Sequence, residues 1–464
     1  MTRSDVGFRS ERGPVLLAIM LSNLLIAIDI AVLSTAVPTV VADIGGFEAF
    51  PWLFTTYLLA QAVTVPVYSK LADMFGRKPI LLFGIGVFLL GSILCAIAPS
   101  MLFLIVFRAV QGLGAGAISP MVLTIPGDIY SIEERARVQG YLSSVWAIAA
   151  VTGPTVGGLF AQFVDWRWIF WINVPLCLGA LWLVRRFLPA TEGRGQGAFD
   201  LRGTLLSGIG FACLMWGLMA LAEARVRTGP AVAALAAGAL LVAAYVRHAR
   251  RTAEPVLALD LLTLRSFRDA MAGGSVFRIA VGGVPFLLPV TLQQRDGYSP
   301  LEAGLFVLVP AVGGFAMKFF SGKILRRTGY RKGLFLHGAL AAGCLAAAGW
   351  VPPREAMVVY AATLFGFGWA RSLQMNAYGT LAYADVARPR LAAATSFFLA
   401  IQNLTVAMGV AAAALLLQGG AAAGTGDAAY SWVYLVLGAV ALASAAMTLA
   451  MPPSAGRDLL QAKR

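Results

Sequence analysis

The chain has 464 residues, of which 59% are hydrophobic and only 12% are charged, and its mean hydropathy is +0.79. Apolar runs of about 20 residues recur along its whole length, a composition that indicates a polytopic membrane protein. The formal net charge of +14 would suit a nucleic-acid-binding protein, but the placement of the basic residues argues against a nucleic-acid partner.

Fourteen apolar runs are long enough to be membrane-spanning helices. They lie at residues 14–36, 50–69, 79–98, 101–121, 139–161, 167–188, 203–222, 230–247, 270–292, 302–320, 333–350, 356–378, 393–417 and 430–450. The first run is too long for a signal-peptide core and lacks a convincing cleavage site, so it is expected to be a retained helix. An even number of spans places both ends of the chain on one side of the membrane.

The basic residues are distributed unevenly between the two sets of loops. Most of the 36 lysines and arginines fall in the tails and in the loops on the same side as the tails. Because cytoplasmic loops collect lysine and arginine, the tails at 1–13 and 451–464 are predicted to be cytoplasmic. The opposite loops hold five arginines, Arg167, Arg225, Arg227, Arg295 and Arg354. Four cations fall within spans, namely Arg108, Arg278, Lys318 and Arg371.

Arg108 and Gln111 interrupt the apolar span 101–121. A guanidinium at this depth is costly, so it should face the bundle interior or an aqueous cavity with a partner. Asp29, well inside the span 14–36, reaches a similar depth because the two spans run in opposite directions. Asp29 either changes its affinity for protons as water, Arg108 or substrate approaches it, or forms a static ion pair that fixes two helices. The Arg108 span also contains small residues that let another helix approach closely, Gly112, Gly114 and Gly116.

A weak internal repeat relates the loop at 69–78 to the loop at 322–331, which share a glycine and basic ends. Two six-helix halves related in this way, with a midplane site between them, are a known transporter plan. We therefore expect an all-α polytopic membrane protein. Its predicted layout is a half at 14–190, an inserted transmembrane hairpin at 200–250 and a second half at 265–450, with polar linkers at 191–200 and 247–268.

Several motifs together resemble the major facilitator superfamily in its fourteen-helix drug:proton antiporter branch, from the first helix to the last. They are Asp29–Pro38, Ser69–Lys78, Leu104–Gly114, Ala149–Gly158 and Trp166–Pro175. The resemblance implies an exporter of a bacterial-type plasma (inner) membrane that works by rocker-switch alternating access. It implies a proton gradient as the energy source and no cofactor, with Asp29 and Arg108 in proton coupling.

The resemblance also assigns conformational gating to two motifs. In the loop motif, Asp73, Gly76 and Arg77 would lock one state of the first half, although Ser69 and Met74 depart from the usual glycine and basic residue. In the fifth span, a proline removes a helix hydrogen bond and glycines permit close packing, so this segment is expected to act as a hinge or a gasket, or simply as a packed kink. Its gating residues are Gly153, Pro154, Gly157 and Gly158.

Arg278 and Arg371 fall in the cytoplasmic half of their spans, and the second half offers no carboxylate at that depth. Buried cations of this kind need carbonyls, water or an anionic ligand. We therefore predict that both engage an acidic or zwitterionic substrate. The alternative is a structural role at the inner interface, which is also the interpretation given to Lys318. Possible hydrogen-bonding neighbours of the substrate are Gln374, Asn376, Tyr57 and Gln61.

The substrate class stays open between small amphipathic or organic-anion compounds and lipophilic cations, which aromatic side chains would favour. A non-transporting membrane sensor or a channel is the remote alternative. An enzyme is not expected, because no nucleophile, metal or acid–base cluster appears and the cysteines and histidines are scattered singly. No phosphate-binding loop appears either. The expected partners are a small-molecule substrate, protons and the lipid bilayer, with the protein a monomer.

Overall fold

The computed structural model describes residues 6–46, 49–190, 193, 199–222, 228–387, 390–456 and 459. The described chain is helical throughout, which confirms the all-α expectation. Eleven of its helical segments are long and apolar enough to cross a membrane. Arg225 and Arg227, most of the 191–200 linker and parts of both tails lie outside the described residues.

The first group of helices covers the first half of the predicted layout. It comprises α1 (Gly13–Ile44), α2 (Trp52–Phe75), α3 (Arg77–Ala96), α4 (Met101–Ile129), α5 (Ile132–Phe163), the single turn α6 (Trp168–Trp171) and α7 (Asn173–Phe187). Helices α2 and α3 are separated by one residue, Gly76, whose φ of 90° ends α2. A capping box starts α5, because the Ser131 hydroxyl accepts from the Glu134 N–H and the Glu134 carboxylate accepts from the Ser131 N–H.

Two helices, α8 (Leu201–Ala222) and α9 (Thr228–Ala249), occupy the predicted hairpin. The second group then comprises the 3₁₀ turn η2 (Leu259–Thr263), α10 (Arg265–Gly282), α11 (Val284–Val290), the π turn η3 (Thr291–Arg295), α12 (Pro300–Trp350), α13 (Met357–Ala382), α14 (Leu391–Ala422) and α15 (Ala428–Thr448).

Helix α12 differs from the sequence prediction, which placed a loop between spans 302–320 and 333–350. The basic segment between them is itself helical, and the helix breaks only at Gly329, where φ is 70° and ψ is 170°. Only glycine adopts this conformation without strain, so a single residue takes the place of the expected loop.

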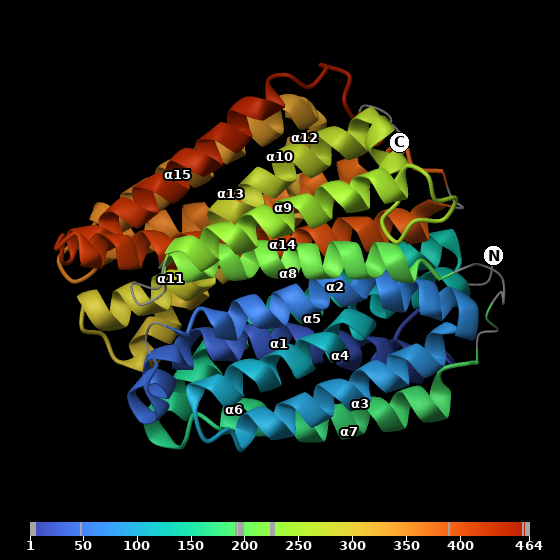
Figure 1. Cartoon of the computed structure of the whole chain (residues 1–464), viewed down its shortest axis with the longest axis horizontal. Coiled ribbons are helices and arrows are strands. Elements are labelled where there is room, and N and C mark those ends of the chain that lie inside the picture. The colour runs from blue at the N-terminus through green and yellow to red at the C-terminus, as the bar shows by residue number, and fades with distance from the viewer. Residues whose placement is uncertain are drawn as a thin grey trace.

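Figure 1 shows helices α1–α7 gathered on one side of the molecule and α10–α15 on the other. The two groups meet where α2 packs against α14 and where α5 packs against α12. Helix α8 lies across the first of these junctions and contacts both α2 and α14 (Figure 1). Helix α9 packs mainly on α8, and many of its apolar side chains stay exposed, as expected of a helix that faces lipid. The hairpin therefore lies beside the seam between the two groups.

Candidate functional site

A network of buried polar side chains lies inside the first group of helices. The Asp29 carboxylate of α1 forms an ion pair with Arg108 of α4, with 2.6 Å between Oδ2 and Nη1. Neither side chain is more than 1% exposed. The predicted partners are thus in contact, in a place shielded from water.

Two amides and one hydroxyl complete this network. Gln111 Nε2 donates to Asp29 Oδ1 at 2.8 Å and to the Ser92 hydroxyl at 2.8 Å, while its Oε1 accepts from Arg108 Nη1 at 2.5 Å. Asn173 Nδ2 donates to Asp29 Oδ1 at 3.1 Å. The carboxylate therefore accepts from three different side chains, which is how a buried charge is normally stabilised.

Close helix packing brings these side chains together. A Cβ built on Gly91 of α3 would lie 2.6 Å from the Cα of Gln111, and one on Gly112 of α4 would lie 2.4 Å from the carbonyl oxygen of Tyr57. The glycines thus allow α3 and α2 to contact the backbone of α4. Sequence analysis identified Arg108 and Gln111 but missed Ser92, because one hydroxyl in an apolar span carries no distinctive signal. Asn173 was visible only as part of the Trp166–Pro175 motif.

Tyr57 and Gln61, predicted to contact substrate, lie on α2 and are both buried. The Tyr57 ring packs beneath the Arg108 guanidinium, 4.3 Å from its Cζ, and Arg108 Nε donates to the carbonyl oxygen of Leu53 at 3.1 Å. Gln61 Nε2 donates to the hydroxyl of Ser119 at 2.6 Å. In this structure Tyr57 therefore belongs to the network around Asp29 and Arg108, and Gln61 links α2 to α4.

Arg278 is the most unusual polar residue of the second group. It lies on α10, its side chain is buried, and neither Nε nor Nη1 has a hydrogen-bond partner among the described residues. Its guanidinium Cζ lies 4.5 Å from the centre of the Phe398 ring. In the part of the chain that the structure describes, no carboxylate pairs with it, in contrast to Arg108.

The other residues predicted to bind substrate in the second group have different surroundings. Arg371 and Asn376 are exposed on α13, and Asn376 Nδ2 lies 3.4 Å from the hydroxyl of Ser321 on α12. Gln374 is buried, and its Nε2 donates to the carbonyl oxygen of Leu334. The structure therefore does not gather these side chains around Arg278, and no interaction among the described residues joins Arg278 to Arg371.

The residues predicted to control conformation lie where helices meet. Arg77 Nε is 2.8 Å from the Asp128 carboxylate, so it ties the start of α3 to the end of α4. Asp73 lies near the end of α2, facing a small cavity shared with the first turns of α14. Lys318 reaches from α12 to donate to the Ser143 carbonyl oxygen at 2.8 Å, so it connects the two groups.

The glycines of α5 face two different helices. Cβ atoms built on Gly153 and Gly157 would lie 2.3 Å from the Cβ of Ala31 and 2.1 Å from the carbonyl oxygen of Val32, both in α1. A Cβ on Gly158 would lie 2.7 Å from the carbonyl oxygen of Pro300 at the start of α12. The carbonyl of Pro154 accepts from the Thr35 hydroxyl at 3.0 Å. This segment therefore packs tightly both within the first group and against the second.

Comparisons with known proteins agree with this fold. The family model described as Major Facilitator Superfamily matches residues 19–384. Multidrug resistance protein 3 of Bacillus subtilis is 32% identical over 70% of this chain and 64% of its own length. The Multidrug resistance protein B homolog of Mycobacterium tuberculosis is 32% identical over 71% of this chain and 61% of its own length. The chain thus spans less than two thirds of these two relatives.

Among solved structures, a bacterial homolog of the human lysosomal transporter Spinster, in an inward-facing and unoccupied conformation, superposes with a TM-score of 0.67. Its sequence is 17% identical, and the match covers 98% of both chains. At this identity the likeness concerns the fold alone.

Proposed function

Because the chain belongs to the major facilitator superfamily, we propose that it is a proton-coupled secondary exporter that works by alternating access. The observation that carries this proposal is the buried Asp29–Arg108 pair, with its hydrogen bonds to Gln111 and Asn173. Ionisable groups placed inside a membrane domain commonly mark proton or substrate pathways. The names of the two multidrug resistance relatives support export as the direction of transport.

A proton and the Arg108 guanidinium compete for the Asp29 carboxylate, and this competition couples protonation to conformation. When a proton binds Asp29, Arg108 loses the counter-ion that stabilises it in a site shielded from water. Breaking one partner of a buried pair costs about 3–5 kcal/mol, so the protonated protein favours a state in which Arg108 finds water or another acceptor. A differential stability of this size is enough to shift a two-state equilibrium by several powers of ten.

The proposed topology has fourteen membrane crossings with cytoplasmic termini, as in the drug:proton antiporter branch. Helix α12 has 51 residues and is broken at Gly329, and at 1.5 Å per residue each of its two parts is about 30 Å long or more, which is enough for one crossing each. Helices α6 and α7 together form one crossing, as do α10 and α11. The α8–α9 hairpin then adds two crossings to two halves of six, and residues 14–190 form the first half.

Gating is assigned to the tight contacts of α5. Gly158 contacts the start of α12, and the Gly304 backbone lies against Pro154, since a Cβ on Gly304 would be 2.5 Å from the Pro154 carbonyl oxygen. These contacts cross between the two halves, so they must form and break as the halves rock. Asp73, Gly76 and Arg77 are assigned the same kind of role near the opposite ends of the helices.

For the substrate, we favour small amphipathic or organic-anion compounds, because Arg278 is a buried cation with unpaired nitrogens. An anionic group would supply the acceptor that the described residues do not. Arg371, which is exposed, would contact the substrate during passage rather than share one site with Arg278. Broad export of lipophilic cations is the second candidate, and the names of the relatives favour it.

A transport assay tests the proposal. Purified protein is reconstituted in vesicles with an acidic lumen, and uptake of carboxyfluorescein, an organic anion, is compared with uptake of ethidium, a lipophilic cation. Saturable uptake that stops when the pH gradient is collapsed supports the antiporter, and the preferred probe identifies the substrate class. Uptake that persists without saturation after the gradient is collapsed would instead indicate a channel.

A further inference from the structure

A cavity of about 990 Å³ lies beside the seam between the two halves, at the end of the molecule where α2 and α9 finish and α10 and α14 begin. The segment 252–263, which connects the hairpin to α10, forms another wall. Neither Arg278 nor any member of the Asp29 network lines this cavity. Its volume is at the upper end of the range of about 300–1,000 Å³ found for small-molecule sites.

The carboxylates on the cavity wall already have partners. Glu254 forms an ion pair with Lys70 of α2, and Asp260 forms one with Arg390 at 2.5 Å. The Asp73 side chain also has an interaction partner. These three carboxylates are therefore not free to attract a cation.

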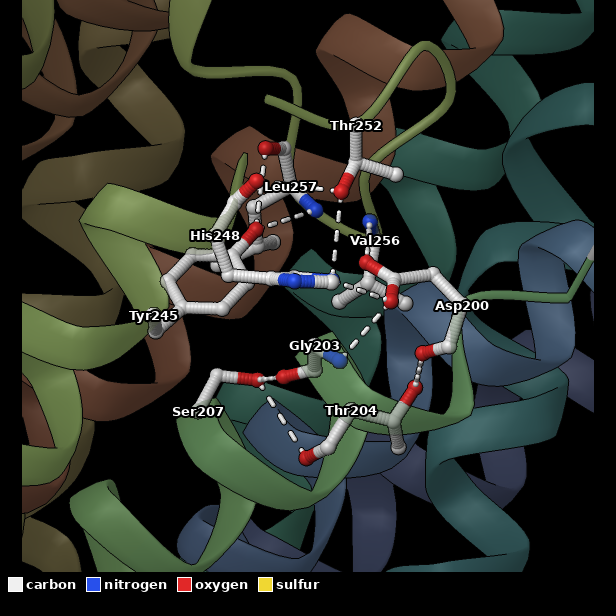
Figure 2. Close-up of polar contacts among 9 residues, drawn as sticks. All are labelled: Asp200, Gly203, Thr204, Ser207, Tyr245, His248, Thr252, Val256 and Leu257. Carbon is white, nitrogen blue, oxygen red and sulfur yellow. Dashed lines mark hydrogen bonds and ion pairs between the residues drawn. The ribbon is translucent and has the colours of Figure 1, made fainter. Parts of the chain in front are cut away.

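Asp200 is the fourth carboxylate on this wall, and Figure 2 shows how it is held. It accepts from the Gly203 N–H at 2.8 Å and from the Val256 N–H at 3.2 Å, and it lies 2.7 Å from His248 Nε2. Beside it, the Tyr245 hydroxyl donates to the Leu257 carbonyl at 3.0 Å and accepts from the Leu257 N–H at 2.8 Å (Figure 2). These bonds fasten the 252–263 segment to the hairpin, so the wall is preformed.

The polar groups on the wall that are still available to a ligand are hydrogen-bond donors. Arg250, exposed at the end of α9, forms no ion pair or side-chain hydrogen bond among the described residues. Arg268 is 56% exposed and forms an ion pair with its chain neighbour Asp269, with 3.6 Å between Nε and Oδ1, while its other guanidinium nitrogens have no hydrogen bond among the described residues. The Ser396 hydroxyl is buried and has no partner among the described residues. A buried hydroxyl without a partner is costly, which suggests that a ligand supplies one.

Apolar side chains provide much of the remaining lining. They come from the hairpin, from the 252–263 segment and from α14, and they are Val246, Ala249, Leu259, Leu262, Ala392 and Ala393. A ligand that fits both surfaces needs an anionic group and an apolar part.

We infer that this cavity binds an amphipathic phosphate, whose anionic group contacts Arg250, Arg268 and Ser396 and whose apolar part lies along α14 and the hairpin. The wall carries four basic and four acidic side chains, so the attraction comes from the arginines left available and not from a net positive charge. Arginines placed between transmembrane helices bind phospholipid headgroups. The phosphate can come from an anionic phospholipid of the adjoining leaflet or from a free organic phosphate. The inference does not depend on proton coupling. The proposed orientation of the protein decides only which leaflet supplies the phospholipid.

Native mass spectrometry of the full-length protein tests the site. The protein is titrated with phosphatidylglycerol and with phosphatidylcholine of the same acyl chains, and then with phenyl phosphate as a soluble competitor. We expect phosphatidylglycerol to bind more tightly than phosphatidylcholine. Replacing both arginines (Arg250→Gln, Arg268→Gln) should weaken phosphatidylglycerol binding about twenty-fivefold, at about fivefold for each arginine, and Ser396→Ala should weaken it further.

The matched control is the double variant Arg247→Gln, Arg251→Gln, which removes two cations from the same end of α9 that do not line the cavity. It should retain binding within about twofold of the unmodified protein. Displacement of the lipid by phenyl phosphate would assign the site to phosphate in general, and retention of the lipid would assign it to phospholipid. Equal losses in both double variants would overturn the inference. So would binding of phosphatidylglycerol and phenyl phosphate no tighter than that of phosphatidylcholine.

Discussion

The substitution Asp29→Asn separates the two interpretations of the buried ion pair. In the native protein Asp29 Oδ2 lies 2.6 Å from Arg108 Nη1, and both side chains are shielded from water. An asparagine keeps the shape and one acceptor oxygen but removes the counter-charge. Because the arginine is then buried without a counter-ion, the substitution should reduce the free energy of unfolding by about 3–5 kcal/mol.

The double variant Asp29→Asn, Arg108→Gln removes both charges together. Replacing a buried pair by neutral groups of similar volume is often close to neutral for stability, so most of the lost stability should return. If Asp29 carries protons, transport driven by a pH gradient should stay absent in the double variant. Exchange of substrate across the membrane without a gradient, measured by counterflow, should survive, because it requires the conformational change alone.

Stability and gradient-driven uptake can be measured on the same protein preparations. Thermal unfolding in detergent gives the relative stability of each variant, and vesicles with an acidic lumen give gradient-driven uptake. A single variant that loses stability but keeps gradient-driven uptake would refute the coupling role. Recovery of such uptake in the double variant would refute it equally and would identify the pair as a static connection between helices.

Three further outcomes are expected. Arg278→Gln should lower the affinity of purified protein for an organic-anion probe about tenfold or more, because it removes a charge-assisted contact. Arg371→Gln should lower the same affinity less. Equal effects of the two variants would contradict a site built on Arg278 alone. Gly158→Leu should destabilise the observed arrangement of the halves by about 1–3 kcal/mol and slow counterflow, while Gly86→Leu, where a Cβ meets nothing within 4 Å, should do neither. Asp200→Asn should lower the Tm at pH 7 because it removes the carboxylate charge that the Gly203 N–H, His248 and the Val256 N–H stabilise, and the difference should shrink below about pH 4.

The sign of the Asp200 effect follows from its surroundings. Burial acts to raise the pKa of the Asp200 carboxyl, but hydrogen bonds from the Gly203 N–H, His248 and the Val256 N–H outweigh it and hold the pKa below its usual range. A lowered pKa gives stability that is present above the unfolded-state pKa of about 3.9 and is lost as the pH falls through the folded-state value. A difference in Tm that grew as the pH fell through this range would contradict the assignment.

The sequence was sufficient to predict the all-α membrane fold and to pair Asp29 with Arg108. Apolar runs of about 20 residues identify the helices, and the opposite directions of two such helices place their charged side chains at one depth. It could not predict which way Gln374 points, because depth along a helix does not fix which neighbour a side chain faces. Gln374 of α13 contacts the α12 carbonyl of Leu334, whereas Arg278 of α10 packs on Phe398.

The cavity beside the hairpin was also beyond the sequence. Its walls combine α2, the hairpin and α14, which are brought together by the packing of α2 on α14 and of α8 across that seam. The segments 191–200 and 247–268 were identified as polar linkers, but the contact between Asp200 and His248 joins residues 48 positions apart. Such contacts depend on the path of the chain around the hairpin, which composition and periodicity do not specify.

Proton movement during transport tests the central proposal most directly. Vesicles that contain the protein and a pH-sensitive dye receive substrate under no imposed gradient, and the internal pH is followed. An antiporter coupled through Asp29 should alkalinise the lumen as substrate enters it, and the Asp29→Asn, Arg108→Gln variant should move substrate without any change in pH. Substrate movement by the unmodified protein with no change in internal pH would contradict the account.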